Sequence, residues 1–155
     1  MTNHWVIRCK CEEGAAIVEF SLLTVLLIMI MLSVVEMSRM ILVYTTMADA
    51  ARAGVRYAMV HGGERSGSGP NGASGPSSGT SCTCPEVSTV VNNFAAAGLI
   101  DTASVNTTVT YPDSSNAAGS RVTVKVDYTY NPLVGYFVPY LSRTLSSTSQ
   151  GVITF

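Results

Sequence analysis

The sequence predicts an α+β protein. A long N-terminal helix, transmembrane in its first half and amphipathic in its second, is followed by a small C-terminal antiparallel sheet and one short helix. Residues 15–35 form an almost unbroken apolar run. Residues 36–60 continue with apolar side chains at helical spacings of three and four. Residues 105–111 and 122–130 alternate apolar and polar side chains, which is typical of half-buried strands.

The composition limits the functions that the chain can have. Its 155 residues suffice for one small domain and a membrane helix. Charged residues make up 12% of the chain, roughly half of the ~25% usual in soluble domains. The net charge is −1 and no basic cluster is present, which argues against nucleic-acid binding. No nucleophile, metal or phosphate-loop motif occurs, so we expect neither an enzyme nor a bound cofactor.

The order of segments at the N-terminus predicts a processing site. Residues 1–14 form a short leader whose last part is polar and ends at Gly14, and Ala15 begins the apolar run. A conventional secretory signal is cut after its apolar part, which is then lost. A cut between Gly14 and Ala15 would instead remove the leader and retain the apolar helix, which is the order found in prepilins.

The apolar run is predicted to span a membrane. At ~1.5 Å per residue, residues 15–35 cover about the 30 Å of a hydrocarbon core. Glu19 is the one charged residue of this run. Arg8 and Lys10 precede the run, so the positive-inside rule predicts a cytoplasmic N-terminus and a C-terminal part outside. The alternative, a buried core helix, seldom contains so unbroken a run of large aliphatic side chains.

No helix breaker follows the run, so residues 36–60 are predicted to extend the helix and to pack against the domain. Asp49 and Arg52 are spaced to pair at i,i+3. The predicted packing face contains Met37, Met40, Ile41, Tyr44, Met47, Ala48, Ala51, Val55 and Ala58. Small residues at i,i+4 permit close approach of another backbone: Ala50, Gly54 and Ala58.

A Gly/Ser-rich linker is predicted at residues 61–81, and a small α+β extracytoplasmic domain at residues 82–155. Pro85 favours the start of a helix, and Gly98 its end. The two alternating segments are joined by a turn-rich connection, so they are predicted to pair antiparallel, with a weaker third strand at residues 143–155. Because a hairpin alone is marginal in water, we expect the amphipathic half of the long helix to cover it.

The cysteines form two Cys-x-Cys pairs. Cys9 and Cys11 lie in the leader, so only Cys82 and Cys84 would remain after processing. An oxidising compartment favours a disulfide between these two residues, and free or intermolecularly paired thiols are the alternative. The two histidines lack the spacing of zinc ligands, so no metal site is expected.

Three separated elements occur in register in the first part of the chain. They are Gly14-Ala-Ala-Ile-Val-Glu-Phe20 with the apolar run behind it, Glu36-Met-Ser-Arg39, and Ala48-Asp-Ala-Ala-Arg-Ala-Gly-Val-Arg56. This combination resembles the TadE-like family, minor pseudopilins of the bacterial tight-adherence (Tad/Flp) pilus system, and implies a pilin-like fold. The resemblance covers about residues 14–57. Relatives commonly carry a proline within the apolar run, where this chain has Val25, so no kink is expected there.

The resemblance implies roles for individual residues. Gly14 would be the last leader residue and Ala15 the new N-terminus, produced by a prepilin peptidase. Glu19 would be the carboxylate found near the start of mature pilin-like subunits, and Phe20 the aromatic residue that follows it in the Tad class.

The resemblance also implies a function, a location and partners. The chain would be a structural subunit in the assembly of a Tad/Flp-type pilus used in adherence. It would cross the bacterial inner membrane once, with its C-terminal domain in the periplasm, and could enter a surface pilus. Its partners would be the prepilin peptidase, other Tad pilins and pseudopilins, the inner-membrane assembly platform and membrane lipid. The second type of minor pseudopilin fits the same residues.

Glu19 is singled out by a physical argument as well. A charged side chain at the centre of a membrane helix costs roughly 2.5 kcal/mol or more and usually marks a functional position. Cleavage before Ala15 creates an ammonium group one helical turn away, in the same subunit or in a neighbour. An ion pair with it would offset the desolvation of Glu19 and fix the axial register between subunits. The alternative is a Glu19 that lies in the headgroup region.

Two further alternatives remain open at the level of the sequence. Glu36 is spaced to pair with Arg39 near the outer interface, or it contacts another subunit. The chain as a whole could also be an uncleaved single-pass membrane protein that displays a small extracytoplasmic binding domain. The mature N-terminus distinguishes this alternative from a processed pseudopilin.

Overall fold

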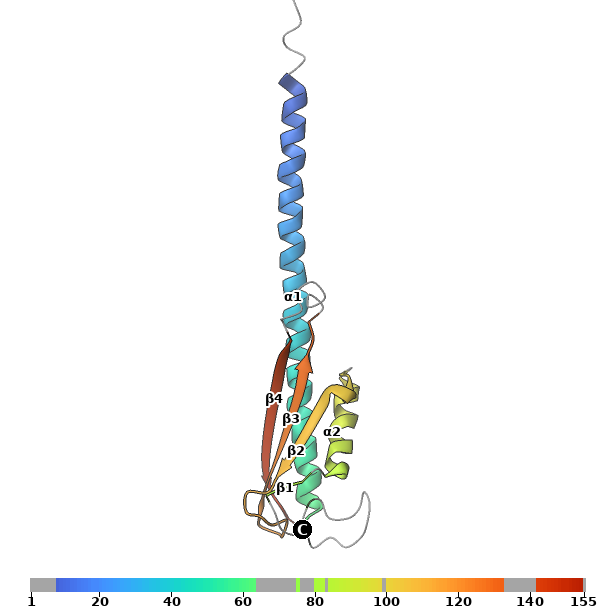
Figure 1. Cartoon of the computed structure of the whole chain (residues 1–155), viewed down its shortest axis with the longest axis vertical. Coiled ribbons are helices and arrows are strands. Elements are labelled where there is room, and N and C mark those ends of the chain that lie inside the picture. The colour runs from blue at the N-terminus through green and yellow to red at the C-terminus, as the bar shows by residue number, and fades with distance from the viewer. Residues whose placement is uncertain are drawn as a thin grey trace, which may run out of the picture. The chain divides into compact units, whose positions relative to one another are not determined.

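A computed structural model of the chain describes residues 8–63, 75, 80–82, 84–98, 100–132 and 142–154. The chain forms two compact units, residues 1–38 and residues 39–155. The predicted α+β class is confirmed, with a long N-terminal apolar helix, an antiparallel sheet and a second, short helix. The elements (Figure 1) are α1 (Arg8–Val60), β1 (Ser81–Cys82), α2 (Pro85–Ala97), the 3-10 helix η1 (Thr102–Ser104), β2 (Val105–Thr110), β3 (Arg121–Tyr130) and β4 (Arg143–Val152).

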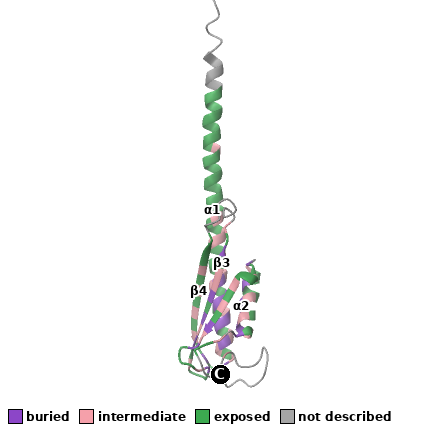
Figure 2. Ribbon diagram, viewed as in Figure 1, coloured by how far each residue is buried: buried purple, intermediate pink, exposed green. Residues whose placement is uncertain are grey.

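The first unit contains a helix that is exposed on all sides (Figure 2). From Gly14 to Ser38 every side chain is exposed except Thr24 and Glu36, which are half-buried. This helix is long and apolar enough to cross a membrane, and none of its most apolar stretch is buried. Since apolar surface in water is unfavourable by about 25 cal/mol per Å², this part of α1 is suited to an apolar environment.

The hydroxyl groups of the apolar segment are satisfied within the helix. Each donates a hydrogen bond to a backbone carbonyl three or four residues earlier, at 2.8–2.9 Å: Ser21 to Val18, Thr24 to Phe20, Ser33 to Met29 and Ser38 to Val34. Such bonds allow a hydroxyl to lie among apolar groups without an unpaired donor. The helix passes through Val25 without interruption.

The helix starts earlier than the sequence analysis placed it. It was expected to begin at Ala15, after the leader, whereas α1 begins at Arg8 and ends at Val60. Arg, Lys and Glu are good helix formers, and a single glycine costs only about 1 kcal/mol in a helix interior. The helical conformation therefore extends through Gly14 into the last part of the predicted leader.

The second unit is built on a four-stranded antiparallel sheet of order β1-β2-β3-β4. β2 pairs with β3 from Val105↔Tyr128 to Thr110↔Thr123, and β3 pairs with β4 from Arg121↔Val152 to Tyr130↔Arg143. The predicted hairpin and the weaker third strand are therefore confirmed. β1 was not anticipated, because its two residues follow a Gly/Ser-rich segment and carry no alternating pattern.

One face of the sheet packs against residues 47–58 of α1 and against α2. Most of the buried residues come from the three layers of this arrangement: Met47, Ala50, Ala51, Val55 and Ala58 of α1, Val87, Val91 and Ala95 of α2, and Val109, Val122, Val124 and Val126 of the sheet. Figure 2 shows the buried residues gathered where these elements meet. The expectation that the long helix covers the hairpin is confirmed.

The predicted packing face of α1 is wrong in its first part. Met37, Ile41 and Tyr44 are exposed, and the fully buried positions begin at Met47. Helical periodicity identifies an apolar side of a helix, but it does not reveal how far the covering elements reach along it. Met40 and Val43 are half-buried, and Val43 packs against the core, so only part of the predicted face is covered in this stretch.

Gly54 sets the distance at which α1 packs. A Cβ atom at this position would lie 2.8 Å from a methyl carbon of Val91 and 3.3 Å from one of Val124. Val91 belongs to α2 and Val124 to β3, so the small-residue stripe faces both elements. The small residues of this stripe therefore allow elements of the same chain, α2 and β3, to pack closely on α1.

Residues after β4 hold the C-terminal end of α1. The backbone N–H and the hydroxyl of Thr154 both donate to the Met59 carbonyl, at 2.9 and 3.0 Å. On the far side of Val60, the N–H of Gly63 donates to the Asn116 carbonyl at 2.7 Å. Carbonyl groups at a helix end lack intrahelical partners, so these contacts satisfy one such group and fix where the helix stops.

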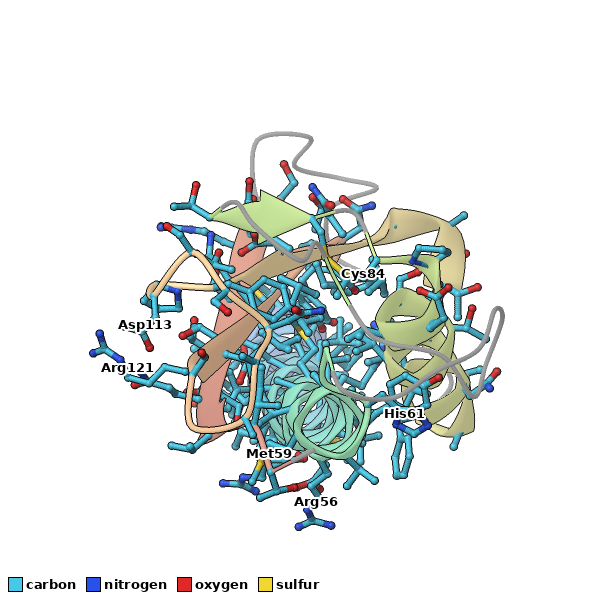
Figure 3. The ribbon with its side chains drawn as sticks, turned by 90° about the horizontal axis from the view of Figure 1, so that it is seen from below. Arg56, Met59, His61, Cys84, Asp113 and Arg121 are labelled. Carbon is cyan, nitrogen blue, oxygen red and sulfur yellow. A yellow bond between two sulfur atoms is a disulfide. The ribbon has the colours of Figure 1, made fainter. Side chains whose placement is uncertain are left out.

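The turn before β3 is held by Asp113 and Arg121 (Figure 3). The Asp113 carboxylate accepts from the Arg121 guanidinium at 2.7 Å and from the Arg121 backbone N–H at 2.8 Å. These bonds favour the ionised carboxylate and lower the pKa of Asp113 from 3.8 to about 2.

We expect Gly54→Val to destabilise the second unit by about 1–3 kcal/mol, the usual cost of overpacking a well-packed core. Ala53→Val is the matched control, because Ala53 lines an open groove and its substitution costs only helix propensity, about 0.6 kcal/mol. Chemical unfolding of the full chain in detergent measures both. Equal losses in the two variants would contradict the packing described for Gly54.

We expect Asp113→Asn to lower the unfolding midpoint at neutral pH. Because the folded pKa lies below the usual value, the stabilisation by the carboxylate is present above pH 3.8 and is lost as the pH falls toward about 2. The difference between the wild type and the variant should therefore shrink over that interval. A constant difference from neutral pH to pH 2 would show that the charge of Asp113 contributes nothing.

Candidate functional site

The predicted processing junction lies on the exposed first unit. Gly14 and Ala15 are both exposed, and a Cβ atom added at Gly14 would meet nothing within 4 Å. The peptide bond between them belongs to the helical backbone of α1. No described side chain therefore shields this bond from an approaching enzyme.

Glu19 is an exposed carboxylate on an otherwise uncharged surface. Between Gly14 and Val35 it is the one charged residue, and the hydroxyl groups of this stretch bond to the helix backbone. Within the part of the chain that the structure describes, Glu19 makes no hydrogen bond or ion pair.

The geometry of a helix brings Ala15 and Glu19 to the same side. Four residues advance the helix by 400°, so the two positions lie about 40° apart around the axis and about 6 Å apart along it. A free amino group at Ala15 would be within reach of the Glu19 carboxylate, either in this chain or in a neighbour at similar height. Phe20, the next residue, is 72% exposed and presents its ring outward.

Glu36 belongs to the first unit and Arg39 to the second. Glu36 is half-buried, and the Arg39 guanidinium lies 5.8 Å from the centre of the Tyr130 ring, within the range of a cation–π contact. The ion pair expected between Glu36 and Arg39 stays a prediction. The sequence analysis did not find the partner Tyr130, although this residue ends the inward-facing series of β3.

Cys82 and Cys84 are joined by a disulfide, with their Cα atoms 5.3 Å apart. Cys82 lies in β1, where it pairs with Val109, and Cys84 is buried and precedes the first residue of α2. Figure 3 shows Cys84 between the sheet and α2. The bond therefore connects the shortest strand to the start of the helix.

A groove of about 490 Å³ lies between α1 and the C-terminal end of α2. Its walls combine apolar side chains, among them Leu42 and Phe94, with the charged Asp49, Arg52 and Arg56. Asp49 and Arg52 form the predicted i,i+3 pair at 2.8 Å. Among the described residues, no group of three or more His, Cys, Asp or Glu side chains could hold a metal ion.

Comparison with known proteins finds a similarity in the first part of the chain. Residues 14–56 match the family described as TadE-like protein, so the predicted resemblance is confirmed over this segment. The matched segment begins at Gly14 and includes Glu19, Phe20 and Arg39. No curated protein and no solved structure matches the chain. The sheet and α2 lie outside the matched segment.

Proposed function

We propose that the chain is a minor pseudopilin of a Tad/Flp-type pilus, with a structural and not an enzymatic role. The observation that carries this proposal is the TadE-like match, which starts at Gly14, the residue before the expected cut. The segment retained after such a cut is the exposed apolar helix, whose single carboxylate lies one turn from the new N-terminus.

The proposed sequence of events follows from this arrangement. The exposed apolar part of α1 anchors the chain in the inner membrane, with the second unit in the periplasm. A prepilin peptidase cuts between Gly14 and Ala15, and the α-amino group of Ala15 becomes a cation. The Glu19 carboxylate pairs with that cation in a neighbouring subunit, which reduces the cost of keeping either charge in the apolar region and fixes the axial position of the incoming subunit.

The groove between α1 and α2 favours a second candidate function. In this alternative the chain keeps its leader and uses the second unit as a binding domain on a single-pass anchor. The groove combines apolar walls with charged groups, as small binding sites commonly do. The two functions differ in what happens at Gly14, so the N-terminus decides between them.

Co-expression with a Tad-type prepilin peptidase should convert the full chain into a product that starts at Ala15. Intact-mass spectrometry and N-terminal sequencing of the purified membrane fraction measure this. An inactive peptidase variant is the control. A chain that retains Met1 beside active peptidase would contradict the pseudopilin proposal and favour the anchored binding domain.

Glu19→Val should leave cleavage largely intact but block incorporation into a pilus or pseudopilus, because the new N-terminus then lacks its partner. Cleavage is followed by mass, and incorporation by immunoblotting of sheared surface fractions. Thr24→Val is the matched control, since it also introduces valine into the apolar helix but removes no charge. Normal assembly by the Glu19 variant would disprove the proposed role of this carboxylate.

A further inference from the structure

β4 forms an edge of the sheet. It pairs with β3 over ten consecutive residues without a bulge, from Arg143↔Tyr130 to Val152↔Arg121. No strand pairs with its other side in the described part of the chain. Since strands in globular proteins are usually about 5–6 residues long, this is a long open edge.

The hydrogen bonds beyond the end of β4 reveal which of its backbone groups face that edge. The N–H of Ile153 donates to the Ser120 carbonyl at 2.9 Å, toward β3, and the N–H of Thr154 donates to Met59, away from β3. Backbone groups alternate in direction along an antiparallel strand. Five residues therefore direct their N–H and C=O groups to the open edge: Thr144, Ser146, Thr148, Gln150 and Val152.

These five residues are available to another chain. All five are exposed, and their backbone groups have no hydrogen-bond partner among the residues that the structure describes. Natural proteins usually protect such an edge with a charged residue, a proline, a bulge or a short strand. From Thr144 to Val152 the strand has no charged residue, no proline and no bulge.

Two arginines lie on α1 near the end of β4, and the charged residues Lys125 and Asp127 of the neighbouring strand pair with each other. A Cβ atom at Gly151 would touch Met59 and Val55, so this end of β4 packs directly on α1. At 100° per residue, Arg52 and Arg56 lie about 20° and 60° around the helix from Met59, on the side away from Val55. Both arginines are exposed, and Figure 3 shows Arg56 and Met59 projecting from neighbouring positions of α1. Asp49 neutralises only Arg52, through their ion pair.

We propose that the open edge of β4 accepts an extended segment of another protein as a fifth strand, with acidic side chains of that segment facing Arg52 and Arg56. Only an extended backbone matches a row of alternating N–H and C=O groups at strand spacing. A second copy of this chain fits poorly. Its own β4 strand contains no acidic residue that could face Arg52 and Arg56.

The test uses the full chain in detergent micelles and a blocked peptide of alternating threonine and glutamate, as long as β4. We expect this peptide to bind and to protect the amides of the five edge residues from hydrogen exchange, as followed by NMR. A peptide of alternating threonine and lysine should not bind. Thr148→Pro removes an outward N–H that β3 does not use, and should weaken binding about fivefold or more.

Two controls keep the interpretation specific. Thr148→Ala keeps the N–H and should bind as the wild type does, whereas Arg56→Glu should reverse the preference between the two peptides with β4 unchanged. The proposal fails if neither peptide protects the edge amides. It also fails if Thr148→Pro binds the peptide normally while the amide signals of β3 show that the variant is folded. Self-association of the chain that Thr148→Pro abolishes would assign the edge to a second copy and would also overturn the proposal.

Discussion

The close packing of α1 at Gly54 is the contact on which the second unit depends. α2 and β3 both meet the helix at this point, and a side chain there would push the two apart. The valines of α2 and of β3 are buried where the helix approaches this closely. The two parts of α1 therefore differ in their side chains: the first part has large exposed apolar ones, and the part that meets the sheet has small buried ones.

Much of this arrangement could be predicted from local pattern. Local sequence alone predicted three elements: the helix that begins at Pro85, the hairpin and the third strand. Each is marked by a periodicity or by a residue typical of an element's end. That Gly14, Ala15 and Glu19 share one helix was predictable for the same reason, since they are close in sequence, and their proposed roles stay a prediction. The family match covers residues 14–56, so it supports the resemblance predicted for that segment and does not bear on the sheet and α2.

The features that were missed depend on contacts between distant residues. Met37, Ile41 and Tyr44 are exposed although Arg39 and Val43 contact the sheet or its core, because the covered face of α1 is narrow there, and no helical pattern reveals how wide it is. β1 is too short for a period, and its place depends on its pairing with β2. The open edge of β4 required the sheet order, because the sequence shows an uncharged strand but not that it lacks a second neighbour.

The two bonds from Thr154 to the Met59 carbonyl have a mechanical consequence. Within the second unit, a force applied to residues 39–60 along the helix axis would load these bonds together with the packing of α1 on the sheet, as a shearing force. Contacts loaded in shear share the force, whereas contacts that are peeled break one after another. The second unit would thus resist such a force through many contacts at once.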